Sequence, residues 1–255
     1  MKTALVVGGA NGIGLSIATE LAKRSDIVKV YIVDKIQLSE EYALEKFETY
    51  QFDLTQEDYS IFDKFLDIDT MMITAGFGRL ALFKDVDESM IPLSFNVNTI
   101  PAMRLIKRFY NKLEGQQDFY CGVMVSIAGF MSSPLFSIYA ATKAALKVFI
   151  ESVNVELLKA GTSNQILNVS PGSLQGTSFT NGKTDLSVTA PMARAIIAEM
   201  EKKNDLFIPQ DEEVFNIVLQ RYHDDFRKEG AHSYDYKLER LKKYEKAPIL
   251  YCKIR

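Results

Sequence analysis

The chain has 255 residues, of which 47% are apolar and 25% charged, and this suits one large α/β domain with a full hydrophobic core. A net charge of −3 and the lack of a basic stripe argue against a nucleic-acid-binding protein. Two widely separated cysteines, Cys121 and Cys252, and two histidines, His223 and His232, argue against a zinc site or a disulfide framework and fit a reducing, cytoplasmic compartment.

The first predicted element is a buried strand. Residues 3–7 form a continuous apolar run, which is typical of a strand covered on both faces of a parallel sheet. The run is too short for a signal peptide or a membrane span. No later segment reaches 18 uninterrupted apolar residues, so we expect a soluble protein that does not bind a membrane.

A glycine-rich turn follows this strand, and a helical pattern over residues 15–24 follows the turn. Glycines let the backbone approach a pyrophosphate, and the helix N-terminus supplies free N–H groups. A tight turn without a ligand is the alternative, but the position after the first strand favours a nucleotide. The candidate cofactor-binding residues here are Gly8, Asn11, Gly12, Ile13 and Gly14.

The second predicted strand, residues 28–33, ends at Asp34, twenty residues after Gly14. A carboxylate at this point accepts hydrogen bonds from both ribose hydroxyls of adenosine and repels a 2′-phosphate. Positions 9–11 carry no Lys or Arg, so NAD is favoured over NADP, although Lys35 lies nearby. A solvated aspartate at a strand end is the alternative interpretation.

Residues 50–54 read as a short third strand, residues 56–65 as a helix and residues 70–74 as a fourth strand that opens into Ala75 and Gly76. Asp53, beside Leu54, either meets the adenine amino group or caps the following helix. Residues 89–113 have helical spacing but contain Asn96, Asn98 and Pro101, which indicates a distorted turn with a polar role. An exposed asparagine is the competing interpretation.

A strand at residues 118–125 delivers Ser126 at its carboxyl end, the edge at which open α/β sheets bind ligands. The helical pattern of residues 140–158 places Tyr139 and Lys143 one turn apart on one face. The ammonium favours the phenolate, and the serine can hydrogen-bond a substrate oxygen. Alone, this spacing usually means one tyrosine and one solvated lysine. The glycine-rich turn at the N-terminus indicates a bound nucleotide, and it therefore favours a catalytic pair over a tyrosine and a solvated lysine.

Lowering the pKa of a tyrosine from about 10 to about 7 requires roughly 4 kcal/mol. A single cation supplies about that much at about 4 Å and an effective dielectric constant of about 20. The three side chains are therefore predicted to form a proton-transfer site.

The helix should end near Gly161, and a strand at residues 165–169 should follow and run into Ser170-Pro171-Gly172. Residues 172–187 are rich in Gly, Ser and Thr and are predicted to form a mobile flap that covers a bound ligand. Residues 190–203 are predicted to form another helix.

Residues 211–229 and 234–246 are charged, Tyr-rich and helical in pattern, with Gly230 between them, and residues 248–254 read as a closing edge strand. We expect residues 210–255 to be an atypical helical segment of the same domain. It could cover the substrate pocket, form a subunit contact or be a solvated helical pair, and the last two roles are favoured. The apolar side chains that form either a pocket wall or ordinary packing are Phe130, Met131, Phe136 and Phe179.

Taken together, these motifs resemble the short-chain dehydrogenase/reductase family, in its short single-domain branch. The resemblance covers residues 1 to about 180 and depends on Gly8, Gly12 and Gly14 at G-x-x-x-G-x-G spacing together with Ser126, Tyr139 and Lys143. It implies a doubly wound parallel sheet, the Rossmann fold, which the alternation of strands and helices also indicates.

The resemblance extends to further positions. Ala75-Gly76 matches the second half of the family's Asn-Asn-Ala-Gly segment, but Ile73-Thr74 replace the two asparagines, so the local support must differ. Asn98 matches the family's fourth catalytic position, where an asparagine holds a water linked to the active-site lysine; Asn96 matches less well.

Two more features of the family concern the cofactor. Pro171-Gly172 and Leu174 resemble the segment whose backbone meets the nicotinamide amide. Thr177 lies one residue later than the usual hydroxyl, which leaves its contact open, and Val7 stands where the family often has threonine.

By this resemblance, the chain is an NAD-dependent oxidoreductase that interconverts a secondary alcohol and a carbonyl, without a metal. Tyr139 exchanges a proton with the substrate oxygen, and Ser126 stabilises the oxyanion. Lys143 lowers the pKa of Tyr139 and holds the nicotinamide ribose, while Asn98 completes a proton path to solvent. Family members commonly pair through the helices that contain Asn98 and Tyr139, so a homodimer or homotetramer is expected.

Two alternatives remain beside this interpretation. A catalytically idle dinucleotide-binding sensor or scaffold is disfavoured because no catalytic position is substituted. A sugar-nucleotide epimerase or dehydratase is disfavoured because Leu15 occupies the third position of the G-x-x-G-x-x-G pattern that starts at Gly9, and because the chain is short.

Overall fold

The computed structural model describes residues 2–177, 179 and 183–245. Within them, seven parallel strands form one sheet in the order β3-β2-β1-β4-β5-β6-β7. The strands are β1 (Lys2–Val7), β2 (Ile27–Asp34), β3 (Phe47–Gln51), β4 (Thr70–Ile73), β5 (Tyr120–Met124), β6 (Ile166–Val169) and β7 (Leu206–Phe207). The strand order reverses direction between β1 and β4. This is the point at which a doubly wound sheet opens a crevice for ligands.

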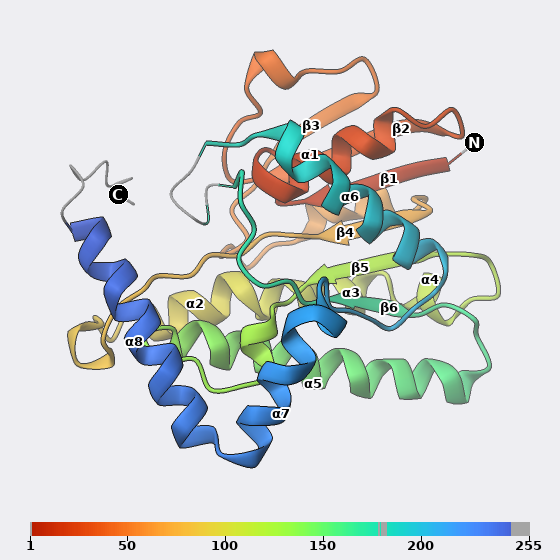
Figure 1. Cartoon of the computed structure of the whole chain (residues 1–255). Coiled ribbons are helices and arrows are strands. Elements are labelled where there is room, and N and C mark those ends of the chain that lie inside the picture. The colour runs from red at the N-terminus through yellow and green to blue at the C-terminus, as the bar shows by residue number, and fades with distance from the viewer. Residues whose placement is uncertain (1, 178, 180–182, 246–255) are drawn as a thin grey trace.

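Helices cover both faces of this sheet (Figure 1). They are α1 (Gly12–Ala22), α2 (Met90–Asn98), α3 (Ile100–Arg108), α4 (Tyr110–Glu114), α5 (Ser137–Ala160), α6 (Leu186–Glu201), α7 (Asn216–Asp224) and α8 (Phe226–Glu245). One apolar cluster joins one face of the sheet to α1 and α6. A second cluster joins the other face to α3, α4 and α5. The predicted single-domain Rossmann fold is therefore confirmed.

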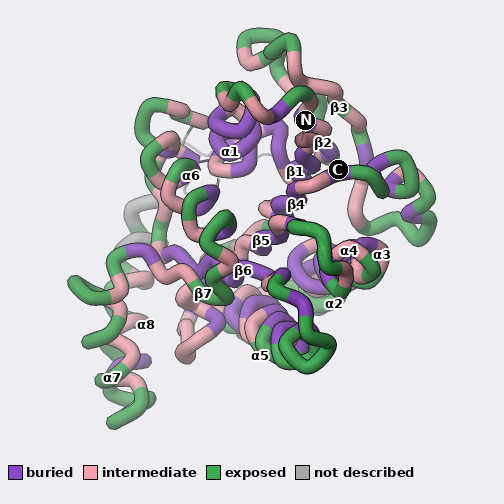
Figure 2. Tube along the Cα trace, turned by 90° about the vertical axis from the view of Figure 1, so that its right-hand side faces the viewer, coloured by how far each residue is buried: buried purple, intermediate pink, exposed green. Residues whose placement is uncertain are grey.

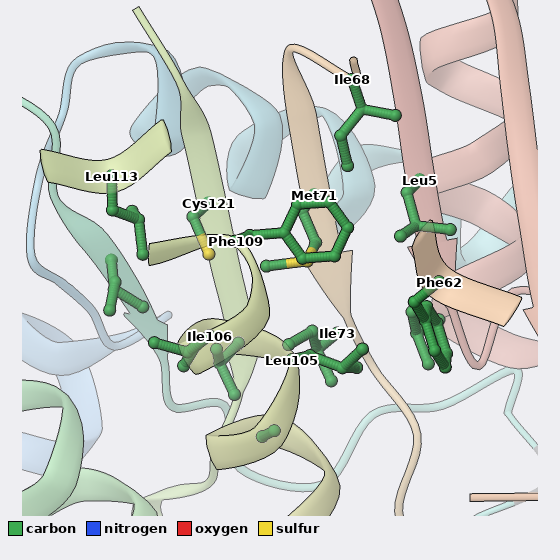
Figure 3. Packing of buried hydrophobic residues seen from close by; sticks show 14 of the residues in the cluster. Leu5, Phe62, Ile68, Met71, Ile73, Leu105, Ile106, Phe109, Leu113 and Cys121 are labelled. Atoms are coloured by element: carbon green, nitrogen blue, oxygen red, sulfur yellow. The ribbon is translucent and has the colours of Figure 1, made fainter. Parts of the chain in front are cut away.

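The second cluster shows how the central strands are anchored. Figure 3 shows Leu105 and Phe109 facing Met71 and Ile73 of β4, with Cys121 of β5 close by. All five side chains are buried. Because both faces of the central strands are covered in this way, their apolar runs are continuous, as the sequence predicts.

The chain between β2 and β4 differs from the prediction. Strand β3 occupies Phe47–Gln51 and not residues 50–54, and only Ser60–Phe65 of the expected helix 56–65 forms, as a 3-10 turn. Phe52 lies just beyond the strand and packs edge-on against Tyr59 and Phe62. This aromatic contact buries Phe52 without extending β3.

The distortion predicted within residues 89–113 is confirmed. Helix α2 ends at Asn98, the backbone of Thr99 leaves the helical region, and α3 begins at Ile100. Pro101 thus lies in the first turn of α3, where its missing N–H is tolerated. A second break at Phe109 separates α3 from α4.

At the other end of the chain, the break between the charged helices lies at Asp225 and not at Gly230, which is inside α8. The Asp225 carboxylate accepts hydrogen bonds from the N–H groups of Arg227 and Lys228 and so begins α8. In the described chain, the edge beside β6 is β7, which the sequence analysis missed. The strand predicted at 248–254 lies outside the described residues.

Helices α7 and α8 stand apart from the two main layers, and Figure 2 shows them mostly exposed or half-buried.

Gly161, in a left-handed conformation with φ of 79°, ends α5 as predicted. Among the described residues, no helix has both the length and the apolar character required to span a bilayer.

Candidate active site

The glycine-rich turn brings the backbones of β1, β4 and α1 into close contact. A Cβ atom at Gly8, where φ is +86°, would lie 2.5 Å from the Ala75 nitrogen, and a Cβ at Gly14 would lie 2.1 Å from the Gly8 oxygen. Real Cβ atoms do not approach so closely, so both positions require glycine. The turn is thus packed tightly between the end of β4 and the start of α1, and it is the candidate pyrophosphate cradle.

The N-terminus of α1 presents a donor at this cradle. The Gly12 N–H donates to the Thr184 hydroxyl at 2.8 Å, and Thr177 lies 3.5 Å from the position of a Cβ on Gly12. A polar oxygen accepts this hydrogen bond where a phosphate oxygen of a dinucleotide would accept it. The residues present therefore fit the cofactor, and Thr184, in the segment after β6, lies against the turn. The flap over a bound ligand stays a prediction.

Thr177 turns inward at this place. Its hydroxyl donates to the Leu174 carbonyl at 3.1 Å, and the side chain is buried.

Asp34 ends β2 with its carboxylate directed at the glycine-rich turn. One oxygen accepts from the Ala10 N–H at 2.9 Å and the other from the Ile36 N–H at 3.1 Å. A carboxylate has about four lone-pair sites, so two ribose hydroxyls can still bind it. The nearby cation Lys35 forms an ion pair with Asp53 at 3.1 Å.

Asp53 lies in a turn and does not cap the next helical segment, Ser60–Phe65, whose N-cap is Tyr59. The alternative of a helix cap is therefore wrong, and contact with the adenine amino group stays a prediction. The Asp53 Oδ1 accepts from the N–H of Thr55 at 2.9 Å and from the Thr55 hydroxyl at 2.8 Å. The neighbouring Leu54 carbonyl accepts from the Tyr59 hydroxyl at 2.6 Å.

Thr74 supplies the local support that the missing asparagines left unexplained. Its hydroxyl lies 3.0 Å from the Val7 carbonyl and 2.9 Å from the Gly8 carbonyl. It therefore ties β4 to the glycine-rich turn at the switch point of the sheet. Thr74 was not predicted as a site residue, although its polar side chain beside Ala75 was a usable signal.

Asn98 is buried and holds the loop that follows β4. Its Oδ1 accepts from the Phe77 N–H at 2.9 Å, and its Nδ2 donates to the Phe77 carbonyl at 2.9 Å and to the Thr142 hydroxyl at 3.2 Å. A Cβ placed on Gly76 would lie 3.2 Å from Asn98 Oδ1 and 3.4 Å from Lys143 Nζ. Asn98 thus lies close to the lysine, whereas Asn96 is exposed.

Ser126, Tyr139 and Lys143 come together at the carboxyl edge of β5. The Ser126 Oγ accepts from the Ala128 N–H at 3.2 Å, and it forms a hydrogen bond with the Tyr139 side chain. The buried Lys143 Nζ donates to the Met124 carbonyl at 2.9 Å and lies 5.6 Å from the centre of the Tyr139 ring.

Burial shifts the pKa values of two members of this trio. Burial raises the pKa of Tyr139 to about 12, against a smaller lowering by the hydrogen bond with Ser126. Burial also lowers the pKa of Lys143 to about 8. Removal from water is the largest cause of both shifts. The expectation that Lys143 favours the phenolate of Tyr139 stays a prediction.

Aromatic rings cover Tyr139. The ring of Phe136 lies 5.4 Å from that of Tyr139, and the ring of Phe179 lies 5.4 Å from Tyr139 and stacks on Phe136 at 6.3 Å. Phe130 instead lies beside Lys147, whose ammonium is 4.9 Å from its ring centre. Met131 is half-buried. Of the predicted wall residues, Phe136 and Phe179 line the site.

A small cavity of about 50 Å³ opens beside the tyrosine. It lies between the loop after β4, the start of α2 and the loop before α5, and Tyr139, Phe136, Gly78 and Arg79 are among its lining residues. Within the described residues, no group of three His, Cys, Asp or Glu side chains could hold a metal ion.

The start of the C-terminal segment reaches the site, which was the less favoured of the roles considered for this segment. A Cβ on Gly172 would lie 2.5 Å from Cζ of Phe215, so this phenyl ring covers the segment Pro171-Gly172. Phe215 ends a π-helical turn, Asp211–Phe215, that leads into α7. The ring therefore lies beside the backbone predicted to meet the nicotinamide.

Comparisons with known proteins agree with this geometry. A family model described as short chain dehydrogenase matches residues 2–186. The chain is 26% identical over 221 residues to an uncharacterized oxidoreductase of Saccharomyces cerevisiae, covering 78% of this chain and 70% of that protein. It is 29% identical over 192 residues to an NADP-dependent 3-hydroxy acid dehydrogenase of Schizosaccharomyces pombe, covering 67% and 71% of the two.

Solved structures show the same fold. A short-chain dehydrogenase from Streptomyces avermitilis superposes with a TM-score of 0.71 at 20% identity, covering 94% of this chain and 98% of that chain. A short chain dehydrogenase from Burkholderia cenocepacia, solved in complex with NADP, superposes with a TM-score of 0.72 at 19% identity, covering 91% and 99%.

Proposed function

Because the chain belongs to the short-chain dehydrogenase/reductase family, whose members bind a nicotinamide dinucleotide, we propose that it is an NAD-dependent oxidoreductase that interconverts a secondary alcohol and a carbonyl. The observation that carries this proposal is the meeting of Ser126, Tyr139 and Lys143 at the carboxyl edge of β5, beside the glycine-rich turn. When bound, the nicotinamide gives or accepts the hydride.

In this proposal, Tyr139 exchanges a proton with the substrate oxygen. With a pKa of about 12, its phenol is protonated at neutral pH. This is the form that donates a proton to the substrate oxygen when a carbonyl is reduced. Ser126 shares a hydrogen bond with Tyr139 and orients the same substrate oxygen.

Lys143 and Asn98 act behind the tyrosine. At pH 7 the Lys143 amine is mostly protonated, since its pKa is about 8, and its charge stabilises the phenolate that remains after proton donation. Asn98 binds the Phe77 backbone, and both Asn98 and this ammonium lie beside Gly76. Asn98 is proposed to hold the water through which the site exchanges protons with solvent.

The choice of NAD over NADP rests on charge near the adenosine ribose. The Asp34 carboxylate ends β2 facing the turn, and the nearby cation Lys35 is paired with Asp53. A 2′-phosphate would meet negative charge there. Comparing KM for NAD and NADP tests this. Asp34→Ala should relax the preference for NAD, and equal KM values in the unmutated protein would contradict the assignment.

The proposed oligomer and location rest on two features. Helix α5 exposes Val148, Val155 and Leu158 at 58%, 57% and 64% of their surfaces, and these positions lie on one face. This apolar strip supports pairing of two copies through α5, as a homodimer or half of a homotetramer. Cys121 is a free, buried thiol, which fits the proposed cytoplasmic location.

The deciding experiment screens alcohols and ketones for NAD(H)-coupled absorbance change, with Tyr139→Phe as the matched variant. We expect the variant to bind NADH, seen by fluorescence, but to lose turnover by about 10²-fold or more. Unchanged turnover would refute the role of Tyr139. Binding of NADH without turnover of any substrate by the unmutated protein would favour the idle sensor or scaffold.

A further inference from the structure

Helix α8 lies against the loop that joins β5 to α5. A Cβ on Gly230 would lie 3.4 Å from Oγ of Ser132 and 4.0 Å from Pro134, and the Lys237 ammonium donates to the Ser133 hydroxyl. Figure 1 shows α8 on the side of the molecule toward which β5 runs. The helix therefore borders the proposed substrate site.

An ion pair holds the first turn of α8 to α7. The Arg221 guanidinium of α7 donates to both carboxylate oxygens of the buried Glu229, at 2.7 and 3.3 Å. Bidentate pairs of this kind hold two elements in a defined orientation. Side chains in the middle of α8 are thus presented at a fixed place beside the loop.

Lys237 stands out among these side chains because its charge is not balanced. It is half-buried, its ammonium bonds the neutral Ser133 hydroxyl, and it lies 5.8 Å from the centre of the Phe136 ring. None of the ion pairs between described residues includes it. Burial lowers the pKa of Lys237 to about 8, as expected for a cation that lacks a nearby anion.

The ring of Phe136 connects this cation to the proposed reaction centre. Phe136 lies 5.4 Å from the Tyr139 ring and 5.8 Å from the Lys237 ammonium, so the ammonium is within about 11 Å of the Tyr139 ring centre. This separation is within the length of a small substrate whose oxygen meets Tyr139. The cavity beside Tyr139 is lined by Phe136 and not by Lys237, so the far end of such a substrate would have to pass the Phe136 ring. Phe136 would lie against the carbon chain between Tyr139 and Lys237.

We propose that Lys237 determines specificity by binding a carboxylate at the far end of the substrate, so that the enzyme acts on oxo acids or hydroxy acids. A carboxylate would supply the anion that Lys237 lacks, and a charge-assisted hydrogen bond out of bulk water is stronger than a neutral one. This inference rests on the proposed function and names its substrate class.

The test compares matched acids and esters at pH 7, where Lys237 is charged. The probes are 4-oxopentanoate, 5-oxohexanoate and 6-oxoheptanoate, each beside its methyl ester, in the NADH-coupled assay. Lys237→Met removes the ammonium and keeps the aliphatic stem. Lys242→Met removes an exposed lysine from the same helix and is the control, and Lys237→Arg should restore the acid preference.

We expect the unmutated protein to prefer at least one acid over its ester in kcat/KM. Lys237→Met should lose about tenfold or more of this preference, mainly through KM, because one hydrogen bond to a charged group has about that effect. Turnover of the esters should not change. Equal use of acid and ester by the unmutated protein, or an unchanged ratio in Lys237→Met, would overturn the inference while leaving the oxidoreductase proposal intact.

A second measurement keeps the inference testable if no probe is turned over. Saturation-transfer NMR reports binding of the same acids and esters in the presence of NADH, with no need for reaction. Binding of an acid that is lost in Lys237→Met and kept in Lys242→Met supports the carboxylate site. Acid binding that persists in Lys237→Met, or no acid binding at all, overturns it.

Discussion

The hydroxyl of Thr74 should contribute more to stability than its size suggests. Thr74→Val keeps the shape of the side chain and removes the hydroxyl that lies between the Val7 and Gly8 carbonyls. The Val7 carbonyl keeps two donors, the N–H groups of Thr74 at 2.8 Å and Ala75 at 3.2 Å. The Gly8 carbonyl has no such replacement among the bonds described, so it carries most of the loss.

An enclosed carbonyl left without its donor costs about 1–3 kcal/mol. We therefore expect Thr74→Val to lower the free energy of unfolding by about 2 kcal/mol, and the melting temperature of a chain of this size by about 4–8 °C. Because Gly8 belongs to the turn, the affinity for NADH should fall as well.

Urea unfolding followed by circular dichroism measures the first effect, and NADH fluorescence titration measures the second. Thr74→Ser keeps the hydroxyl and is the matched control, which should retain most of the stability and the affinity. The reasoning would be refuted if Thr74→Val matched the unmutated protein in both measurements, or if Thr74→Ser lost as much as Thr74→Val.

Three further predictions follow from burial and backbone geometry. Burial lowers the pKa of Lys143 from 10.5 to about 8, so between these pH values the unfolded chain binds more protons than the folded one, and this group makes the free energy of unfolding rise with pH. Urea midpoints measured from pH 8 to 10 should therefore rise less steeply in Lys143→Met than in the unmutated protein. Identical slopes would contradict the lowered pKa of Lys143. Gly230 lies inside α8, and a Cβ there would lie 3.4 Å from Oγ of Ser132, which is an ordinary contact. Because glycine loses more conformational freedom in a helix than alanine, Gly230→Ala should stabilise the protein by about 0.5–1 kcal/mol. A lower urea midpoint would show that α8 packs too tightly against Ser132 for a methyl group. Burial raises the pKa of the Cys121 thiol to about 12, so this thiol should be unreactive in the native protein. In a Cys252→Ser variant, a thiol reagent should react with Cys121 only after denaturant is added. Rapid labelling of the native variant would show that this part of the core opens.

Parts of the fold and of the site were accessible from sequence because they depend on local patterns. Apolar runs marked β1, β2 and β5, and the residues that follow these strands, such as Asp34 and Ser126, lie at one edge because parallel strands end together. Helical spacing placed Tyr139 and Lys143 on one face of α5.

The misplaced elements show where local patterns are insufficient. Strand β3 ends before Phe52 because an aromatic contact with Tyr59 and Phe62, and not strand pairing, buries that ring. Gly230 looked like a break between helices, yet the Asp225 carboxylate caps α8 five residues earlier. In both cases a contact competed with the residue's intrinsic preference and outweighed it.

The amino-acid sequence by itself determined the parallel sheet and which residues follow its strands, because these depend on periodicity and spacing along the chain. The family entered separately, through the resemblance of its joint motifs. Only the tertiary structure decided that the tyrosine is a weaker acid than a free one, that Thr74 supports the glycine-rich turn, and that Lys237 stands near Phe136. Each of these depends on how water is excluded and on which distant segments meet, and packing across the whole chain settles both.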